Sequence, residues 1–215
     1  MNRLRFSHIA TERDLRLAIV EAGRIAYERG LITANDGNIS ARLADHLVII
    51  SPSGLCKGRL DLEDLVIVDM EGTLVWTNSK RKLKPSSDTH MHLDVYRQRS
   101  DIRAVIHAYP TFATALTIAK IPFPEDVLPE ILLTLGPVPT TPIASPSSED
   151  ATTAAWKLIS NHDAILLRQQ GSLTVGKNLD VALINLERIE KVAEIFFYSQ
   201  LMGKVNRLPP DGLEK

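Results

Sequence analysis

The order of short apolar runs along the chain is the feature that most limits its fold. Some runs of strand length are separated by helical segments and others by tight turns, so strands and helices do not alternate strictly. This order predicts helices flanking a mixed sheet, in an α/β or α+β arrangement. The expected strands are residues 38–43, 46–51, 65–69, 73–76, 104–107, 138–143, 164–168 and 172–175.

Apolar residues at helical spacing predict the helices. The first covers residues 11–29, where Thr11 can cap it with Asp14 three residues on and Gly30 ends it. Pro110 stands near the first turn of a helix that follows the strand at 104–107. The other expected helices are residues 87–98, 148–160 and 179–202.

Chain length and composition indicate one domain. No repeat, low-complexity tract or composition break divides the 215 residues. We expect an N-terminal extension over 1–10, the domain over 11–203 and a C-terminal tail over 204–215. A domain of this size buries a large core without disulfides or metal ions.

Charge and cysteine content exclude several classes of protein. Lys and Arg number 25 against 26 Asp and Glu, whereas nucleic-acid-binding domains are usually basic. The one cysteine, Cys56, excludes an intrachain disulfide and fits a reducing compartment. No apolar run reaches the ~18 residues of a membrane span, and residues 1–10 lack the apolar core of a signal peptide. We therefore expect a cytoplasmic protein with no nucleic-acid or membrane partner.

Three polar, turn-rich stretches interrupt the apolar elements. They are Asn35-Asp36-Gly37-Asn38, Ser51-Pro52-Ser53-Gly54 and Pro85-Ser86-Ser87-Asp88. Each offers small hydroxyl or amide side chains with backbone N–H groups, and the third stands at a predicted helix N-terminus, which favours anions. Together they predict a phosphate pocket without any Lys or Arg. Singly, each stretch is more often a plain turn or helix cap.

Two further stretches end predicted buried strands in polar groups. His107, in Val-Ile-His-Ala-Tyr-Pro, stands at a strand end, where α/β sites commonly collect reactive groups. A lone His is also often a hydrogen-bonded structural residue. The strand predicted at 164–168 is followed by Gln169, Gln170 and Gly171.

In order and spacing, these five stretches resemble the signature of the class II aldolase and adducin head family, which includes L-fuculose-1-phosphate aldolase. The resemblance runs from about Leu15 to Leu201. It implies a single-domain three-layer α/β/α sandwich whose central sheet is mixed, largely antiparallel and flanked by helices. The matching segments are Gly-Asn-Ile-Ser, Ser-Pro-Ser-Gly, Lys-Pro-Ser-Ser-Asp, Ala-Val-Ile-His-Ala-Tyr-Pro and Leu-Leu-Arg-Gln-Gln-Gly-Ser-Leu-Thr-Val-Gly.

The resemblance also implies a site. Family members usually bind a substrate phosphate with the first three stretches and hold Zn²⁺ or another divalent ion, such as Mn²⁺, with three His. The ion stabilises an enediolate, and an acid after Ser-Ser transfers the proton. By position, Asp88 would be that acid, His107 a metal ligand, and Glu130 a group acting across a subunit boundary. The phosphate ligands would be Asn35, Asn38, Ser53, Gly54, Ser86 and Ser87.

The chain departs from this pattern at three positions. Tyr109 and Gln170 stand where the second and third His are expected, and Asp88 replaces Glu. Because Zn²⁺ prefers His, thiolate or carboxylate ligands, the standard three-His site cannot form. One alternative is a rebuilt metal site of Asp88, His92 and His107, since residues four apart share a helix face. Another is metal-free acid–base chemistry by Tyr109 and His107, with Gln170 as a hydrogen-bond donor to the enolate.

Two functions remain open at this point. The complete phosphate stretches favour an enzyme: a lyase that cleaves or rearranges a small phosphorylated sugar, or an isomerase, dehydratase or decarboxylase of the same family. The lost His ligands favour a non-catalytic protein that serves assembly, like the adducin head. The substitutions could also have been engineered into a catalytic parent. The resemblance further implies a homotetramer with sites between neighbouring subunits.

Overall fold

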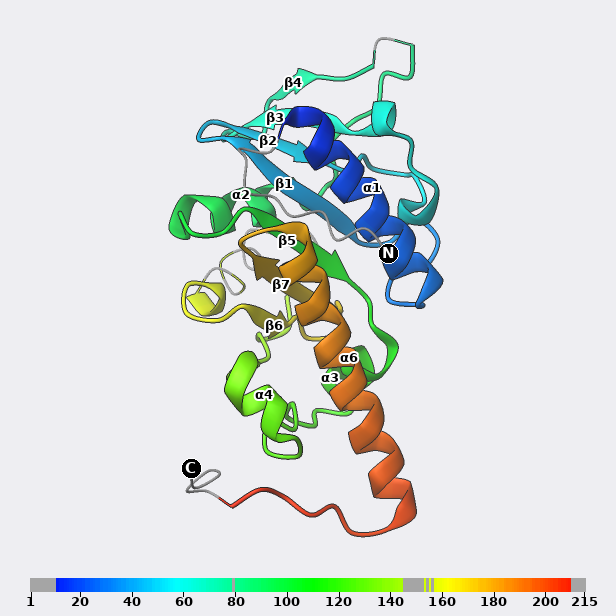
Figure 1. Cartoon of the computed structure of the whole chain (residues 1–215), viewed down its shortest axis with the longest axis vertical. Coiled ribbons are helices and arrows are strands. Elements are labelled where there is room, and N and C mark those ends of the chain that lie inside the picture. The colour runs from blue at the N-terminus through cyan, green and yellow to red at the C-terminus, as the bar shows by residue number, and fades with distance from the viewer. Residues whose placement is uncertain (1–10, 79, 145–152, 154, 156, 210–215) are drawn as a thin grey trace.

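The computed structural model describes residues 11–78, 80–144, 153, 155 and 157–209. These residues form one sheet of seven strands, with helices on both faces (Figure 1). The strands are β1 (Asn38–Ala44), β2 (Leu47–Ile50), β3 (Val66–Asp69), β4 (Leu74–Trp76), β5 (Ala104–Ala108), β6 (Ala164–Leu166) and β7 (Ser172–Gly176). Their order across the sheet is β4-β3-β2-β1-β5-β7-β6.

Neighbouring strands of the sheet run antiparallel in every pair. The one parallel feature in the described residues is an isolated bridge between Thr140 and Leu166. The strand predicted at 138–143 is therefore wrong, because only this bridge forms there. Pro139 and Pro142 lack the N–H donors that a longer ladder needs.

The helices that cover the sheet begin and end close to their predicted bounds. Thr11 and Asp14 form the expected capping box at the start of the first helix, and Gly30, at φ 69°, follows its end. The helix predicted at 148–160 begins outside the described residues, and residues 153, 155 and 157–159 of it are helical. The described helices are α1 (Glu12–Glu28), α2 (Thr89–Gln98), α3 (Thr111–Ile118), the unpredicted α4 (Pro129–Thr134) and α6 (Leu179–Met202), with 3₁₀ turns η1 (Lys57–Arg59) and η2 (Leu62–Asp64).

Two hydrophobic cores, one on each face of the sheet, make the fold a three-layer sandwich. The larger core packs α1, α3 and α6 against one face, and the smaller packs α2 and the helical residues near 159 against the other. Successive side chains of β5 point to opposite faces of the sheet and so contribute to both cores. Ala104 and Ile106 pack in the larger core, and Val105 packs in the smaller one. By the same alternation, His107 points to the side of Val105, the face of the sheet that α2 covers.

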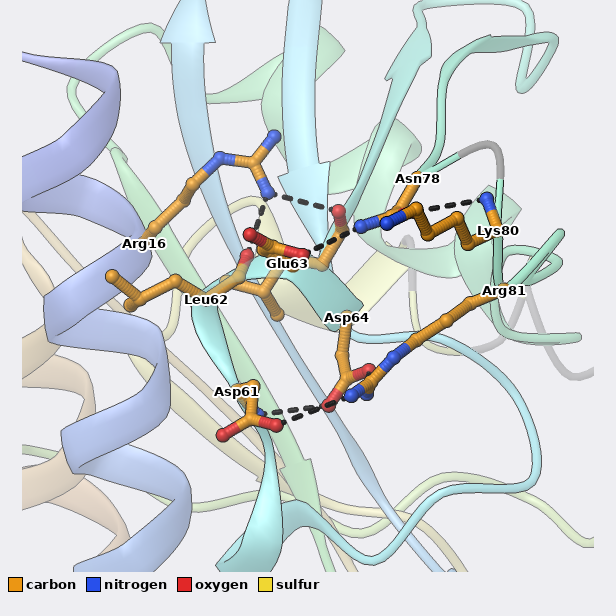
Figure 2. Close-up of polar contacts among 9 residues, drawn as sticks. Arg16, Asp61, Leu62, Glu63, Asp64, Asn78, Lys80 and Arg81 are labelled. Carbon is orange, nitrogen blue, oxygen red and sulfur yellow. Dashed lines mark hydrogen bonds and ion pairs between the residues drawn. The ribbon is translucent and has the colours of Figure 1, made fainter.

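Buried polar contacts hold α1 to the β3–β4 edge of the sheet (Figure 2). The Arg16 guanidinium donates to the carbonyls of Leu62 and Leu65, each at 2.9 Å, and stacks 4.4 Å from the ring of Trp76. Nearby, Arg81 pairs with the buried carboxylate of Asp64. These contacts join the helix to the edge of the sheet, so we assign this cluster a structural role, and Arg16 Nη2 is buried without a hydrogen-bond partner among the described residues.

The ends of the described chain pack differently. Arg207 forms an ion pair with Asp126 at 2.6 Å, and the Leu208 N–H donates to the Asp126 carbonyl at 2.7 Å, so residues near 208 contact the domain. The predicted extension at 1–10 lies outside the described residues. Among the described helices, none has the length and apolar character needed to cross a membrane.

Candidate active site

A cavity of about 200 Å³ opens where β1 begins and β5 ends. The sheet register creates it, because Asn38 pairs with His107 across β1 and β5. A bridge between Pro52 and Pro85 brings the two serine-containing stretches side by side. Segments that are up to 135 positions apart in the chain, from Asn35 to Gln170, therefore face one space.

Ten of the twelve predicted site residues line this cavity, and two do not. His92 is completely buried beneath it. Glu130 is exposed on α4 and lies outside the lining in a single chain, so its action across a subunit boundary stays a prediction. The ten are Asn35, Asn38, Ser53, Gly54, Ser86, Ser87, Asp88, His107, Tyr109 and Gln170.

Two glycines allow the backbone to close around the site. Gly37 has φ 70°, and a Cβ there would lie 2.6 Å from the His107 carbonyl. Gly171 has φ 79°, and a Cβ there would lie 2.0 Å from the Ala108 carbonyl. Any larger residue would push the 37–38 or 170–171 segment away from β5. These glycines therefore fix the positions of Asn38 and Gln170 relative to His107.

The polar centre of the cavity is a contact between Asp88 and His107. Asp88 Oδ2 lies 3.3 Å from His107 Nδ1 and accepts a hydrogen bond from Asn38 Nδ2 at 2.9 Å. His107 Nε2 lies 2.9 Å from the Gln170 carbonyl, which can only accept, so Nε2 carries a proton. Nδ1 is then the ring nitrogen that can exchange a proton with Asp88. The geometry therefore allows a proton to pass between Asp88 and His107 at the wall of the cavity.

Tyr109 lies beside this pair, with its ring centroid 5.1 Å from that of His107. Burial, and then the charges of Asp88 and Asp36, raise the pKa of the Tyr109 hydroxyl above its usual value. The phenol therefore stays protonated at neutral pH and can donate a hydrogen bond or a proton. A metal ligand would need the phenolate, which this environment disfavours.

The donors around His107 do not fit the three-ligand metal site of the resemblance. The proton on His107 Nε2 is held by the Gln170 carbonyl, and the Gln170 side-chain amide donates to the Ala144 carbonyl. Throughout the described residues, no three His, Cys, Asp or Glu side chains form a group that could hold a metal ion. Asp88, His92 and His107 do not form such a group there, and His92 is completely buried with its Nδ1 beside the Ser40 hydroxyl. The reaction steps below therefore use only the chain's own groups.

His92 belongs instead to a buried polar cluster between α2 and β1. Its Nδ1 lies 2.7 Å from the Ser40 hydroxyl, which also lies 2.8 Å from the hydroxyl of Tyr96. Its Nε2 is buried without a hydrogen-bond partner in the described part of the chain. Burial, and then the charge of His107, lower the pKa of His92 to about 3, while Asp88 opposes the shift. His92 is therefore neutral in the folded protein at all ordinary pH values.

The lowered pKa of His92 predicts a loss of stability in acid. Between pH 6.5, the ordinary pKa of His, and about 3, the unfolded state binds a proton that the folded state does not. The free energy of unfolding should thus fall as pH falls, with a contribution of up to about 1.4 kcal/mol per pH unit. Urea unfolding of wild type and His92→Gln at pH 6.5, 5.8 and 5.0 measures this slope. The slope should flatten in His92→Gln and persist in the exposed control His46→Gln; equal slopes in all three proteins would contradict the account.

Two charged residues of the cavity were not predicted. Asp36 lies at its exposed rim, and Lys57 lies in its wall. The expectation of a pocket without Lys or Arg is therefore wrong. Lys57 stands three residues after Gly54, and the start of η1 turns it back toward Asn35. The sequence around this turn has no helical or strand periodicity that would predict the direction of the Lys57 side chain. The one available signal was that Lys57 closely follows the Ser-Pro-Ser-Gly stretch.

A second cavity, of about 230 Å³, lies beyond α3. Thr117, Phe123, Val138 and Arg168 are among its lining residues. None of the predicted site residues lines it, and it holds neither a His nor a Ser. Its residues offer no proton-transfer pair, so we assign the chemistry to the first cavity.

Comparison with known proteins gives consistent matches over most of the chain. The family described as Class II Aldolase and Adducin N-terminal domain matches residues 17–197. The 3-oxo-tetronate 4-phosphate decarboxylase of Pectobacterium atrosepticum is 31% identical over 193 residues, covering 88% of this chain and 86% of that protein. The 5-deoxy-D-ribulose 1-phosphate aldolase of Bacillus thuringiensis is 31% identical over 198 residues, covering 91% of this chain and 90% of that protein. Among solved structures, YgbL of Klebsiella pneumoniae matches with a TM-score of 0.85 at 27% identity, covering 94% of this chain and 96% of that structure's chain.

Proposed function

The chain belongs to the class II aldolase and adducin N-terminal domain family, and from this we propose that it is a lyase that cleaves a carbon–carbon bond in a small phosphorylated sugar. The observation that carries the proposal is one cavity that joins serine, asparagine and glycine groups to the Asp88–His107 pair. Relatives named as a sugar-phosphate aldolase and a phosphorylated oxo-acid decarboxylase support this substrate class.

The phosphate would bind at the end of the cavity formed by the three polar stretches. Ser53, Ser86 and Ser87 offer hydroxyl donors there, and Gly54, at φ 78°, lets the backbone approach an anion closely. Hydrogen bonds from hydroxyl and amide groups to an ionised acceptor are stronger than those to a neutral one. The phosphate would thus fix the sugar with its reactive carbons toward Asp88.

The proton steps would then fall to Asp88, His107 and Tyr109. In an aldol cleavage, Asp88 takes the proton of the hydroxyl β to the carbonyl, and the C–C bond electrons pass to the carbonyl fragment as an enediolate. His107 can share the proton gained by Asp88, because its Nδ1 lies 3.3 Å away. Tyr109, with its raised pKa, would protonate the enediolate carbon or donate to its oxygen.

Class II aldolases generally use a divalent metal, and this chain's donors do not reproduce the usual three-His set. The expectation of Zn²⁺ or Mn²⁺ therefore comes from the family alone, and the donors of this chain do not support it. Elemental analysis of the purified protein tests it directly. We expect less than about one tenth of an equivalent of any divalent metal after dialysis, and a full equivalent of Zn²⁺ or Mn²⁺ would contradict this reading of the donors.

Decarboxylation is a second candidate reaction, favoured by the 31% identity to 3-oxo-tetronate 4-phosphate decarboxylase. Loss of CO₂ next to a carbonyl also leaves an enediolate-like carbanion, which Tyr109 could protonate. It requires no base to remove a hydroxyl proton, so it would depend less on Asp88. A comparison of Asp88 variants on both classes of substrate therefore separates the two reactions.

We also propose a homotetramer in the cytoplasm. The C-terminal half of α6 runs beyond the sheet (Figure 1). It exposes aromatic and aliphatic side chains, among them Phe197, Tyr198 and Leu201. Phe112, Phe197 and Tyr198 stack there with ring centroids 5.4 to 5.9 Å apart. Apolar surface of this kind favours subunit contact. Light scattering at micromolar concentration should give about four times the chain mass of 23.8 kDa, and a monomer would count against the tetramer.

Thermal-shift titration distinguishes an enzyme from a non-catalytic assembly protein. A ligand that binds only the folded state raises the unfolding temperature. We expect stabilisation by inorganic phosphate and by ketose 1-phosphates, with a larger shift for the sugar phosphates. No shift with any phosphorylated compound would exclude the proposed substrate class and favour the assembly role.

A further inference from the structure

Among the residues that the structure describes, Lys57 is the only Lys or Arg in the lining of the cavity. The residue is 2% exposed, and its Nζ donates to the carbonyls of Asn35 at 2.6 Å and Leu55 at 2.9 Å. An ammonium group has three N–H donors, so these two bonds leave one donor for a further partner. Buried ammonium groups are costly unless paired, which calls for an account of this one.

The position of Lys57 relative to the polar stretches points toward an anion. Its Nζ bonds to Asn35 of the first stretch, and its backbone follows Gly54 of the second. The cavity lining also contains the carboxylates of Asp36 and Asp88, so among its described Asp, Glu, Lys and Arg side chains two are acidic and one is basic. A bound phosphate would add further negative charge. Lys57 is the lining side chain whose ammonium group can offset that charge.

We propose that Lys57 is a phosphate-binding residue, whose ammonium group donates its remaining N–H to a phosphoryl oxygen of the substrate. This inference rests on the proposed function and adds a charge requirement to it. Lys57 would select phosphorylated compounds over neutral sugars of the same shape, because only the phosphate recovers the cost of its burial. The carbonyls of Asn35 and Leu55 hold the ammonium in position before the substrate arrives.

The burial of Lys57 gives independent support. Burial lowers the pKa of its ammonium group, and the nearby Asp36, Cys56 and Asp88 act in the opposite direction. A phosphate in the cavity would act in the same direction as these acidic groups and stabilise the charged form. Arg59, two residues on, instead lies exposed near the ring of Tyr27 and provides a matched cation outside the site.

The test compares binding of inorganic phosphate to wild type, Lys57→Gln, Lys57→Met and the control Arg59→Met. Calorimetry at fixed pH and two salt concentrations gives the dissociation constants. Lys57→Gln keeps hydrogen-bond donors but removes the charge, so we expect affinity to fall at least tenfold and its salt dependence to weaken. Lys57→Met should lose still more, and Arg59→Met should stay within twofold of wild type.

A purely structural Lys57 gives a different pattern. Its variants would unfold at lower temperature, yet the folded protein would bind phosphate within twofold of wild type, and that result overturns the inference. If wild type binds phosphate and Lys57→Gln binds it equally well, only the role of Lys57 fails. If wild type itself binds no phosphate, the proposed function fails together with it.

Discussion

Replacing Asp88 with Asn should lower the rate of sugar-phosphate cleavage by about 10³-fold, within the range of a lost acid–base group. The amide cannot accept the hydroxyl proton, whereas its oxygen can still accept the hydrogen bond from Asn38 that Asp88 receives at 2.9 Å. The fold and phosphate affinity should therefore change little. Steady-state kinetics should show the loss in kcat, with KM within about threefold of wild type.

The control for this substitution is Asp94→Asn on α2, the helix that Asp88 immediately precedes. Asp94 pairs with Arg97 on the outer part of α2, away from the cavity lining, so its loss should change kcat less than twofold. Retention of more than a tenth of wild-type kcat would show that Asp88 is not the base.

The double substitution Tyr109→His with Gln170→His should create tight Zn²⁺ binding where wild type has little. The three imidazoles at 107, 109 and 170 would then supply a Zn²⁺ ligand set, with Asp88 within reach of the same space. We expect a dissociation constant below about 1 µM, equivalent to roughly 8 kcal/mol of binding free energy. To bind the metal through Nε2, His107 must give up its hydrogen bond to the carbonyl of residue 170. The loss of this bond subtracts from the free energy of Zn²⁺ binding.

Competition with a chromophoric chelator measures this affinity, and the two single substitutions provide the controls. Each single variant supplies only two His and should bind at least tenfold more weakly than the double variant. Zn²⁺ should also raise the unfolding temperature of the double variant alone. If the folded double variant stays metal-free, the correspondence of Tyr109 and Gln170 with the family's His ligands is wrong.

Local chemistry made much of the fold predictable. The capping pair of Thr11 and Asp14 marked the start of α1, and the structure confirms this capping box. Turn residues separated the antiparallel strands. The prediction at 138–143 failed because Pro139 and Pro142 interrupt the segment, and strand propensity cannot replace the missing N–H donors.

The site was predictable where motif and register coincide. Asn38 and His107 are widely separated in the chain, and the family resemblance assigned both to the site. The structure brings them together by pairing them directly across β1 and β5. The ring contacts of His107 were not predictable, because a sequence does not indicate that the Gln170 carbonyl accepts from Nε2. Lys57 was missed for a similar reason. Its position in the cavity lining depends on how η1 packs against α1, and the sequence does not indicate that packing.

The most direct test of the central claim is a ³¹P NMR time course with wild type and Asp88→Asn. Each protein is incubated with a panel of ketose 1-phosphates and with 3-oxo-tetronate 4-phosphate, before and after chelation of divalent metals. The account predicts that wild type converts at least one compound to a new phosphorylated product at a rate that chelation leaves unchanged, and that Asp88→Asn does not. Binding of the panel by wild type without any product would contradict it and identify the cavity as a binding site alone.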